Sequence, residues 1–404
     1  MFETFRNAWK IDDLRKRLLF TLLILVLFRL GCAIPVPYIS AGALTSMFAG
    51  GTGDMLEYLN MMSGGALSEC TLFALGVQPA INASIIMQLL AVAIPYLENL
   101  TKEGEEGQRK MRRITNYVGA GIGLMLSIGY YFIIRNMGAL SYTEGFAGIF
   151  SAVVIVLAFT AGSQLCAWMG NQIDSKGIGN GISMILFASI ISRLPTSVIT
   201  SIRNISTGSL EWWVALLVFL GALAIIVLIV YVNDAERRVP VQYAKRVVGR
   251  KMYGGQSTHL PMKVNMSGVM PIIFAQSIAS IPATIAAFTG KTDGWVNTWF
   301  GTNSIPYAII YFLLIIFFAY FYSTIQFNPI EVANNLKKNG GFIPGFRPGK
   351  PTSEFIQKVL NKITLFGALY LGIIAVVPIL VAHFSQSASL TGVSLGGTSI
   401  IIVV

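Results

Sequence analysis

Residues Arg237 to Lys263 read RRVPVQYAKRVVGRKMYGGQSTHLPMK, a basic segment that separates two long apolar runs near the middle of the chain. The segment holds seven Lys and Arg residues and no acidic residue. Such a density of cations beside apolar runs is typical of a loop on the cytosolic side of a membrane. Two interpretations fit: a signal that only fixes orientation, or a docking surface for an acidic or anionic partner. The apolar residues among the cations favour docking; they are Val247, Val248, Met252 and Tyr253.

The composition of the whole chain indicates a polytopic membrane protein. Its 404 residues are 54% hydrophobic and 12% charged, with a mean hydropathy of +0.67, whereas soluble domains carry about 25% charged residues. The net charge of +11 comes from clusters between apolar runs rather than from one basic face. Cys32, Cys70 and Cys166 lie in or beside apolar stretches without metal-ligand spacing, so we expect neither a disulfide framework nor a metal site.

Apolar runs of about 20 residues, the length that crosses roughly 30 Å of hydrocarbon, predict ten transmembrane helices in an all-α protein. The runs lie near 18–34, 70–94, 114–134, 148–169, 182–199, 212–232, 266–289, 305–325, 363–384 and 393–404. The last run has only 12 residues before the sequence stops. We therefore expect the tenth helix to be incomplete.

Lys and Arg residues fall mainly in alternate loops, which predicts the orientation of the chain. One side carries 24 of the 29 cations and the other carries four, with Arg29 inside the first run. The positive-inside rule then places the amino terminus in the cytosol. Five helices per half permit two inverted halves. We expect an amphipathic cytosolic helix at 1–17, a first half at 18–200 and a second half at 201–404 with cytosolic loops at 233–265 and 326–362.

Two of the runs carry polar residues at membrane depth. The second run, GVQPAINASIIMQLL, interleaves Gln78, Asn82, Ser84 and Gln88 with a helical stripe of Val77, Ile81 and Ile85. The seventh run contains Gln276 and Ser277 between two prolines. Polar side chains inside a membrane are expected to face protein or water rather than lipid. Both helices are therefore expected to face an internal cavity, although polar contacts between helices are the alternative.

The stretch from Asp54 to Glu69 fits neither a membrane span nor a plain loop. Apolar residues recur at helical spacing, and Ser63, Gly64 and Gly65 interrupt them. One interpretation is a hinged amphipathic helix on the non-cytosolic side that folds back into a funnel. An interfacial helix is the alternative.

Several motifs along the chain resemble the SecY family, the channel subunits of the bacterial protein-conducting translocon. They are MMSGGAL and FALGVQPAINASIIMQLL at 61–90, KEGEEGQRKMRR at 102–113, GIGNGIS at 177–183, YAKR and QSTHLPMKVN at 243–265, FNPIEVANNLKKNGGFIPGFRPG at 327–349, and GGTSIIIVV at 396–404. The resemblance covers the chain in order. It implies a clamshell of two halves around a central pore, an apolar pore ring, a plug and a lateral gate that opens to lipid.

Carried over position by position, the resemblance assigns residues to each part. The pore ring falls on Val77, Ile81, Ile85, Ile182, Leu186, Ile273 and Ile402. The plug falls on Asp54–Glu69, with Met55, Leu59, Met62, Ser63, Gly64, Gly65 and Leu67. The polar residues along the lateral gate are Gln78, Asn82, Gln88, Gln276 and Ser277. Val77 and Leu186 replace the isoleucines that are frequent in the family and keep the ring apolar.

The resemblance also implies partners. The basic loops look like sites for the SecA motor ATPase or for the ribosome, whose RNA offers phosphates. The docking residues are Arg237, Arg238, Lys245, Arg246, Arg250, Lys251, Lys337, Lys338, Arg347 and Lys350. The small membrane subunits SecE and SecG, signal peptides, nascent polypeptides and the lipid bilayer are further expected partners. The expected location is the bacterial cytoplasmic membrane.

The alternative function is an ion-coupled secondary transporter with inverted repeats. Such a protein is expected to hold ionisable residues at mid-membrane, and only Arg29 and His383 come near that depth. The segment 177–181 lacks the strand context and GK[ST] ending of a nucleotide-binding loop, so we predict a turn that opens a helix. The resemblance implies a protein-conducting channel that is not an enzyme and needs no cofactor, and the lack of a nucleotide-binding motif means that we expect a partner to supply the energy.

Overall fold

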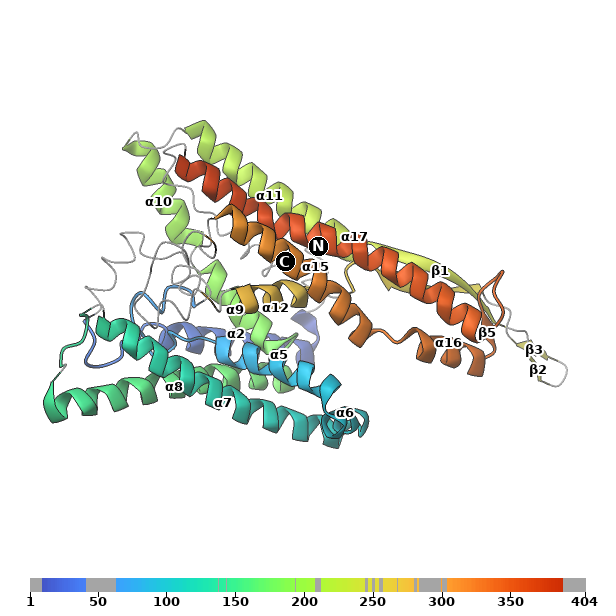
Figure 1. Cartoon of the computed structure of the whole chain (residues 1–404), viewed down its shortest axis with the longest axis horizontal. Helices are drawn as coiled ribbons and strands as arrows, with labels where there is room; N and C mark the ends of the chain where they lie inside the picture. Colours follow the sequence, from blue (N-terminus) through green and yellow to red (C-terminus); the bar gives the residue numbers. More distant parts are fainter. Residues whose placement is uncertain are drawn as a thin grey trace. The chain divides into compact units, whose positions relative to one another are not determined.

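The computed structural model describes residues 9–40, 63–136, 138–142, 144–192, 194–207, 212–243, 246–248, 251–253, 257–266, 268–279, 282, 299 and 304–387. The chain divides into two compact units (Figure 1). The described helices of the first unit lie within Met1–Glu211. Those of the second unit lie within Trp212–Ala279 and Asn303–Ile402.

The first unit is helical. Its elements are α2 (Asp12–Gly31), α5 (Gln78–Ala93), α6 (Pro95–Lys102), α7 (Glu105–Asn136), α8 (Gly145–Lys176), α9 (Gly181–Ile191) and α10 (Leu194–Ser206). Asp12 to Arg17, expected in a separate amphipathic helix, form the first turns of α2; Met1–Ala8 lie outside the described residues. Helices α5 and α6 bend by 107° because Pro95 disfavours helical geometry at Ile94, whose backbone is extended.

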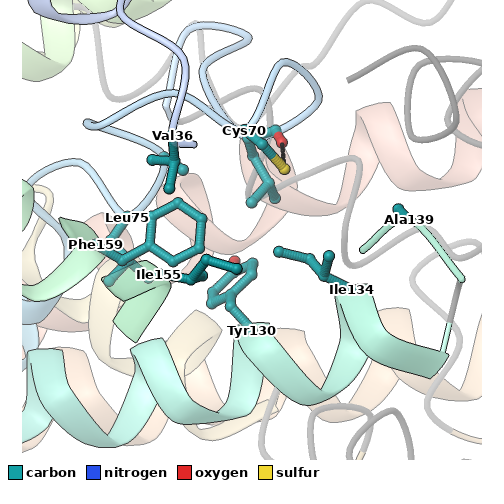
Figure 2. Packing of buried hydrophobic residues seen from close by; sticks show 10 residues of the cluster. Val36, Cys70, Leu75, Tyr130, Ile134, Ala139, Ile155 and Phe159 are labelled. Carbon is teal, nitrogen blue, oxygen red and sulfur yellow. Dashed lines mark hydrogen bonds between the residues drawn. The ribbon is translucent and has the colours of Figure 1, made fainter. Parts of the chain in front are cut away.

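A hydrophobic cluster holds the segment before α5 on α7 and α8. Tyr130 and Ile134 of α7 and Ile155 and Phe159 of α8 belong to one cluster with Cys70 (Figure 2). Two backbone hydrogen bonds tie the same segment to the end of α2: Val36 donates to the Cys70 carbonyl at 2.9 Å, and Leu72 donates to the Ile34 carbonyl at 2.9 Å. The residues that lead into α5 are thus fixed on three helices.

The second unit combines helices with a small sheet. Its elements are α11 (Trp212–Asp234), β1 (Glu236–Tyr243), β2 (Arg246–Val248), β3 (Lys251–Tyr253), β4 (Ser257–Lys263), α12 (Met270–Ala279), α15 (Ile305–Gln326), α16 (Pro329–Lys338), β5 (Gly341–Phe342) and α17 (Lys350–Ser387). The antiparallel strand order is β4-β1-β5, and β2 pairs with β3 as the hairpin tip seen in Figure 1. The basic segment expected as a loop is therefore largely a β-hairpin, because Val and Tyr, which favour strands, recur along it.

The described residues contain four helices long and apolar enough to cross a membrane, or five if the bent α5–α6 pair counts as one span. Helices α9 and α12 and the apolar part of α11 are shorter. The second predicted run starts too early, because residues 63–77 form turns and α5 begins only at Gln78. The ten-helix arrangement stays a prediction. The expected cytosolic loop 326–362 contains α16, β5 and the first turns of α17, which is about 57 Å long at 1.5 Å per residue.

Candidate functional site

Helix α5 carries the first three residues assigned to the pore ring. Val77 is the N-cap residue, and Pro79 in the first turn suits the helix start because its missing N–H needs no partner there. Val77, Ile81 and Ile85 are 3%, 8% and 6% exposed, whereas Ile86 on another face is 39% exposed. The predicted stripe is therefore one buried apolar face of α5.

The polar residues of α5 differ in how far they are exposed. Gln78 and Asn82 are half-buried and Gln88 is exposed. Gly119 and Gly123 of α7 pack closely on the first turns of α5: a Cβ at Gly123 would lie 3.7 Å from Cβ of Pro79, and one at Gly119 would lie 3.5 Å from Cβ of Ala83. Small residues let the two backbones approach, as in helix pairs within membranes.

Helix α9 carries the next two ring residues, Ile182 and Leu186, one turn apart. Leu186 is buried and Ile182 is half-buried. Asn180 caps the helix by accepting from the Ser183 N–H at 3.1 Å, and Asp174 accepts from the Gly181 N–H at 2.7 Å. The segment 177–181 is thus the predicted turn that opens a helix, and two side-chain oxygens fix its position.

The described end of the expected plug, Ser63 to Glu69, forms turns packed in the first unit. Gly64 has φ +68°, and a Cβ there would lie 2.9 Å from the Ser189 carbonyl of α9 and 3.0 Å from Nη1 of Arg29. Leu67 is buried, and its N–H donates to Oγ of Ser63 at 3.2 Å. Gly64 therefore needs to be glycine both for its backbone and for space. Met55, Leu59 and Met62 lie outside the described residues.

Helix α12 of the second unit carries Ile273, Gln276 and Ser277. Ser277 donates to the Ile273 carbonyl at 2.8 Å, and Gln276 is buried. Phe274 stacks on Phe318 of α15 with ring centroids 5.3 Å apart and planes at 14°. The stack holds α12 on α15. The seventh ring residue, Ile402, lies outside the described residues.

The two basic loops are joined in the second unit, which the sequence analysis did not anticipate. Strand β1 pairs with β4 and also with β5 of the other loop, where Gln242 opposes Phe342 and Tyr243 opposes Gly341. A hydrophobic cluster fills the inner face of the sheet; its buried members are Val239, Val241, Met262, Leu336, Ile343, Ile356 and Leu360. We call β1, β4, β5, α16, the turn at 343–349 and the first three turns of α17 the basic platform.

The platform displays cations on its outer surface. Arg237, Arg238, Lys263, Lys337, Lys338, Arg347 and Lys350 are all exposed. Arg238 pairs with Glu236 through an Nε–Oε1 distance of 2.7 Å, so one predicted docking cation is already neutralised. Of the hairpin cations, Lys245 and Arg250 lie outside the described residues, while Arg246 and Lys251 belong to β2 and β3.

One backbone feature and two contacts build the turn that carries Arg347. Gly345 has φ +88°, which favours glycine. The Phe346 ring packs on Phe355 of α17 with centroids 4.3 Å apart, and the Thr352 hydroxyl donates to the Arg347 carbonyl at 2.8 Å. The Arg347 backbone is therefore fixed while its side chain stays in solvent. The glycines and the proline of GFRPG at 345–349 indicate a turn. The sequence does not show that Phe346 in this turn packs on Phe355.

These features define a class of protein. The chain is a multi-pass, mostly helical membrane protein with buried apolar stripes on short helices and a folded basic platform outside its apolar spans. Among the described residues, no group of three His, Cys, Asp or Glu side chains could hold a metal ion. The three cysteines are free and buried.

Comparisons with known proteins identify the family. Residues 71–404 match the SecY family model. The chain is 45% identical to "Protein translocase subunit SecY" of Streptomyces coelicolor, covering 100% of this chain and 94% of the relative. It is 43% identical to the protein of the same name from Escherichia coli K12, covering 98% and 89%. The chain belongs to the SecY family, as its motifs predicted.

Solved structures agree on the fold. The chain is similar to "The structure of a protein conducting channel", with a TM-score of 0.66 and 16% identity over 96% of this chain and 89% of that chain. It is also similar to "Sec61 in the Canine ribosome-channel complex from the endoplasmic reticulum", with a TM-score of 0.62 and 15% identity over 96% and 89%. At these identities the likeness establishes the SecY/Sec61 fold alone.

Proposed function

We propose that this chain forms a channel through which unfolded secretory polypeptides cross a membrane and from which apolar segments pass sideways into lipid. The observation that carries the proposal is family membership along the whole chain, at 45% identity to a protein translocase subunit. Relatives with this name favour a channel over a catalyst, and they do not support the alternative of an ion-coupled transporter.

The seal of the channel is an apolar ring. Ten helices in two inverted halves would surround a pore, and the aliphatic residues of α5, α9 and α12 would meet in it together with Ile402. A narrow apolar constriction dewets, so ions lose hydration there and do not pass. Branched aliphatic side chains can still close around a moving peptide of any sequence. The buried stripe of Val77, Ile81 and Ile85 supports this role.

The plug closes the resting channel from the non-cytosolic side. Its described end is packed against α9 through Gly64 and against the cluster around Cys70 through Leu67. The lateral gate separates α5, which carries Gln78, Asn82 and Gln88, from α12, which carries Gln276 and Ser277. Once the gate opens, an apolar segment gains about 25 cal/mol for each Å² of apolar surface that it buries in lipid.

The basic platform receives the partner that drives transport. SecA and the ribosome are the proposed partners, and the solved structures of ribosome-bound relatives support the second. SecE and SecG are the proposed membrane subunits. The proposed location is the bacterial cytoplasmic membrane, with the platform and the amino terminus in the cytosol, as the distribution of Lys and Arg favours.

Transport of a secretory precursor into vesicles tests the function. Vesicles that contain the purified chain with SecE and SecG, together with SecA and ATP, should protect a precursor from added protease. Vesicles without the chain should not. A transporter would instead move small solutes when an ion gradient is imposed. Solute uptake without precursor protection would contradict the proposal.

A further inference from the structure

The basic platform is connected to the membrane helices by two short links. Strand β1 starts at Glu236, two residues after α11 ends at Asp234. Strand β4 ends at Lys263, and α12 starts at Met270 after a six-residue link. The platform hairpin therefore leads directly into α12, the helix that carries Ile273 and Gln276.

An amide pair closes the base of the hairpin. Nδ2 of Asn265 donates to Oδ1 of Asn233 at 3.0 Å, which joins the link before α12 to the last turn of α11. The Val264 N–H donates to the Ala235 carbonyl at 3.0 Å and extends the β1–β4 ladder beyond its last pair. Both sides of the hairpin base are thus held together at the membrane helices.

Gly367 of α17 allows the base of the hairpin to pack closely on that helix. A Cβ at Gly367 would lie 2.8 Å from the Val264 carbonyl oxygen, so any larger residue would displace the link. One turn earlier on α17, the Thr364 hydroxyl shares a hydrogen bond of 2.9 Å with Ser323 of α15. Val264, Asn265 and Thr364 line the same small cavity. The end of α11, the hairpin base, α15 and α17 form one packed junction.

We propose that Asn265 and Gly367 are positioning residues that couple the basic platform to α12, so that a partner docked on the platform shifts the gate helix. The inference rests on the proposed function and assigns this part of the channel a role in transmission rather than in docking. A link of six residues without these contacts would bend and absorb the displacement. With the contacts, the hairpin and the start of α12 move together.

The test uses substitutions that change the junction without touching the docking cations. Asn265→Leu removes both the donor and the acceptor from the amide pair at a similar side-chain volume, so no side-chain hydrogen bond to Asn233 remains. Asn233→Asp keeps an acceptor and is the conservative control. Gly367→Ala adds the methyl group that meets the Val264 carbonyl. Gly221→Ala is its control, because nothing lies within 4 Å of a Cβ there.

Two measurements separate docking from transmission. The first is the Kd of SecA for channels in lipid discs. The second is the distance between spin labels at Ile86→Cys of α5 and Ile278→Cys of α12, with and without SecA and a non-hydrolysable nucleotide. Cys32, Cys70 and Cys166 are replaced by alanine in every sample. The rate of precursor transport is measured in parallel.

The parent and both control variants should bind SecA and change the label distance on binding. Asn265→Leu and Gly367→Ala should bind SecA within about twofold of the parent but lose at least half of the distance change and about fivefold in transport rate. An undiminished distance change in both junction variants would overturn the inference. So would a loss of binding equal to the loss of transport, since the junction would then only shape the docking surface. A parent that binds no SecA but transports through ribosomes or not at all would instead contradict the proposed partner.

Discussion

The rings of Phe346 and Phe355 lie with their centroids 4.3 Å apart and their planes at 32°. This contact ties the Arg347 turn to the start of α17, whose buried Ile356 belongs to the core of the basic platform. An exposed arginine on a fixed backbone loses less conformational freedom on binding than one on a loose loop. The pair is therefore expected to matter for affinity more than for folding.

The first prediction tests that contact with Phe346→Ala. Losing an aromatic pair costs about 0.5–1.5 kcal/mol beyond lost burial, and the loss is confined to one turn. Partner affinity should fall about fivefold, with little change in the thermal unfolding of the chain. Phe366→Ala is the control, because Phe366 lies on the same helix and is 58% exposed. Equal binding by the two variants, measured by titration of labelled SecA, would remove the role assigned to the ring pair.

Charge reversal on the platform gives the second prediction. Arg347→Glu should weaken binding of SecA or ribosomes at least tenfold at low salt, and added salt should reduce the difference. Arg238→Glu should have a smaller effect, because Glu236 already neutralises Arg238 at 2.7 Å. Membrane orientation should survive both changes, since most cytosolic cations remain. Protease protection checks orientation, and equal losses for the two variants would contradict the residue-specific assignment.

A third prediction compares two isoleucines on α5. Ile81→Asn places an amide in the proposed apolar ring and should raise the ion conductance of resting channels in planar bilayers. Ile86→Asn introduces the same group at a position that is 39% exposed, where Ile81 is 8% exposed, and should not raise conductance. Channels that conduct equally with either substitution would mean that Val77, Ile81 and Ile85 do not form the seal.

The fourth prediction separates backbone strain from packing at two glycines. Gly64 and Gly104 both have positive φ, +68° and +78°, so alanine costs about 1–2 kcal/mol at either one. A Cβ at Gly64 would also lie 2.9 Å from the Ser189 carbonyl, whereas nothing lies within 4 Å at Gly104. Gly64→Ala should therefore loosen the plug and raise the resting conductance, while Gly104→Ala should not. Similar conductance in the two variants would show that the contact with α9 does not hold the plug.

Local patterns predicted the long apolar helices and the turn at 177–181 that opens a helix, because hydrophobic runs and turn residues act within a few residues of the chain. The sequence did not reveal that β5 joins β1 or that Phe346 meets Phe355, because these contacts join residues about 100 and nine positions apart whose pairing depends on the shared core. Hydropathy also placed the start of the second helix too early. Residues 63–77 contain many apolar residues, as a membrane helix does. Their glycines with positive φ and their packing in the cluster around Cys70 favour turns instead. Lys358 and Lys362 were expected in a loop and lie on α17, because a helix can extend past the membrane with a polar outer face.

The central claim is that polypeptides move along the apolar stripe of α5. The most direct measurement is cysteine crosslinking to a precursor stalled during transport by a folded carboxyl-terminal domain. Single cysteines at Ile81 and Ile86 are compared in channels whose three native cysteines are replaced by alanine. The account predicts disulfide formation between the precursor and Ile81→Cys, with little at Ile86→Cys. Crosslinks at Ile86→Cys alone, or equal crosslinks at both positions, would contradict it.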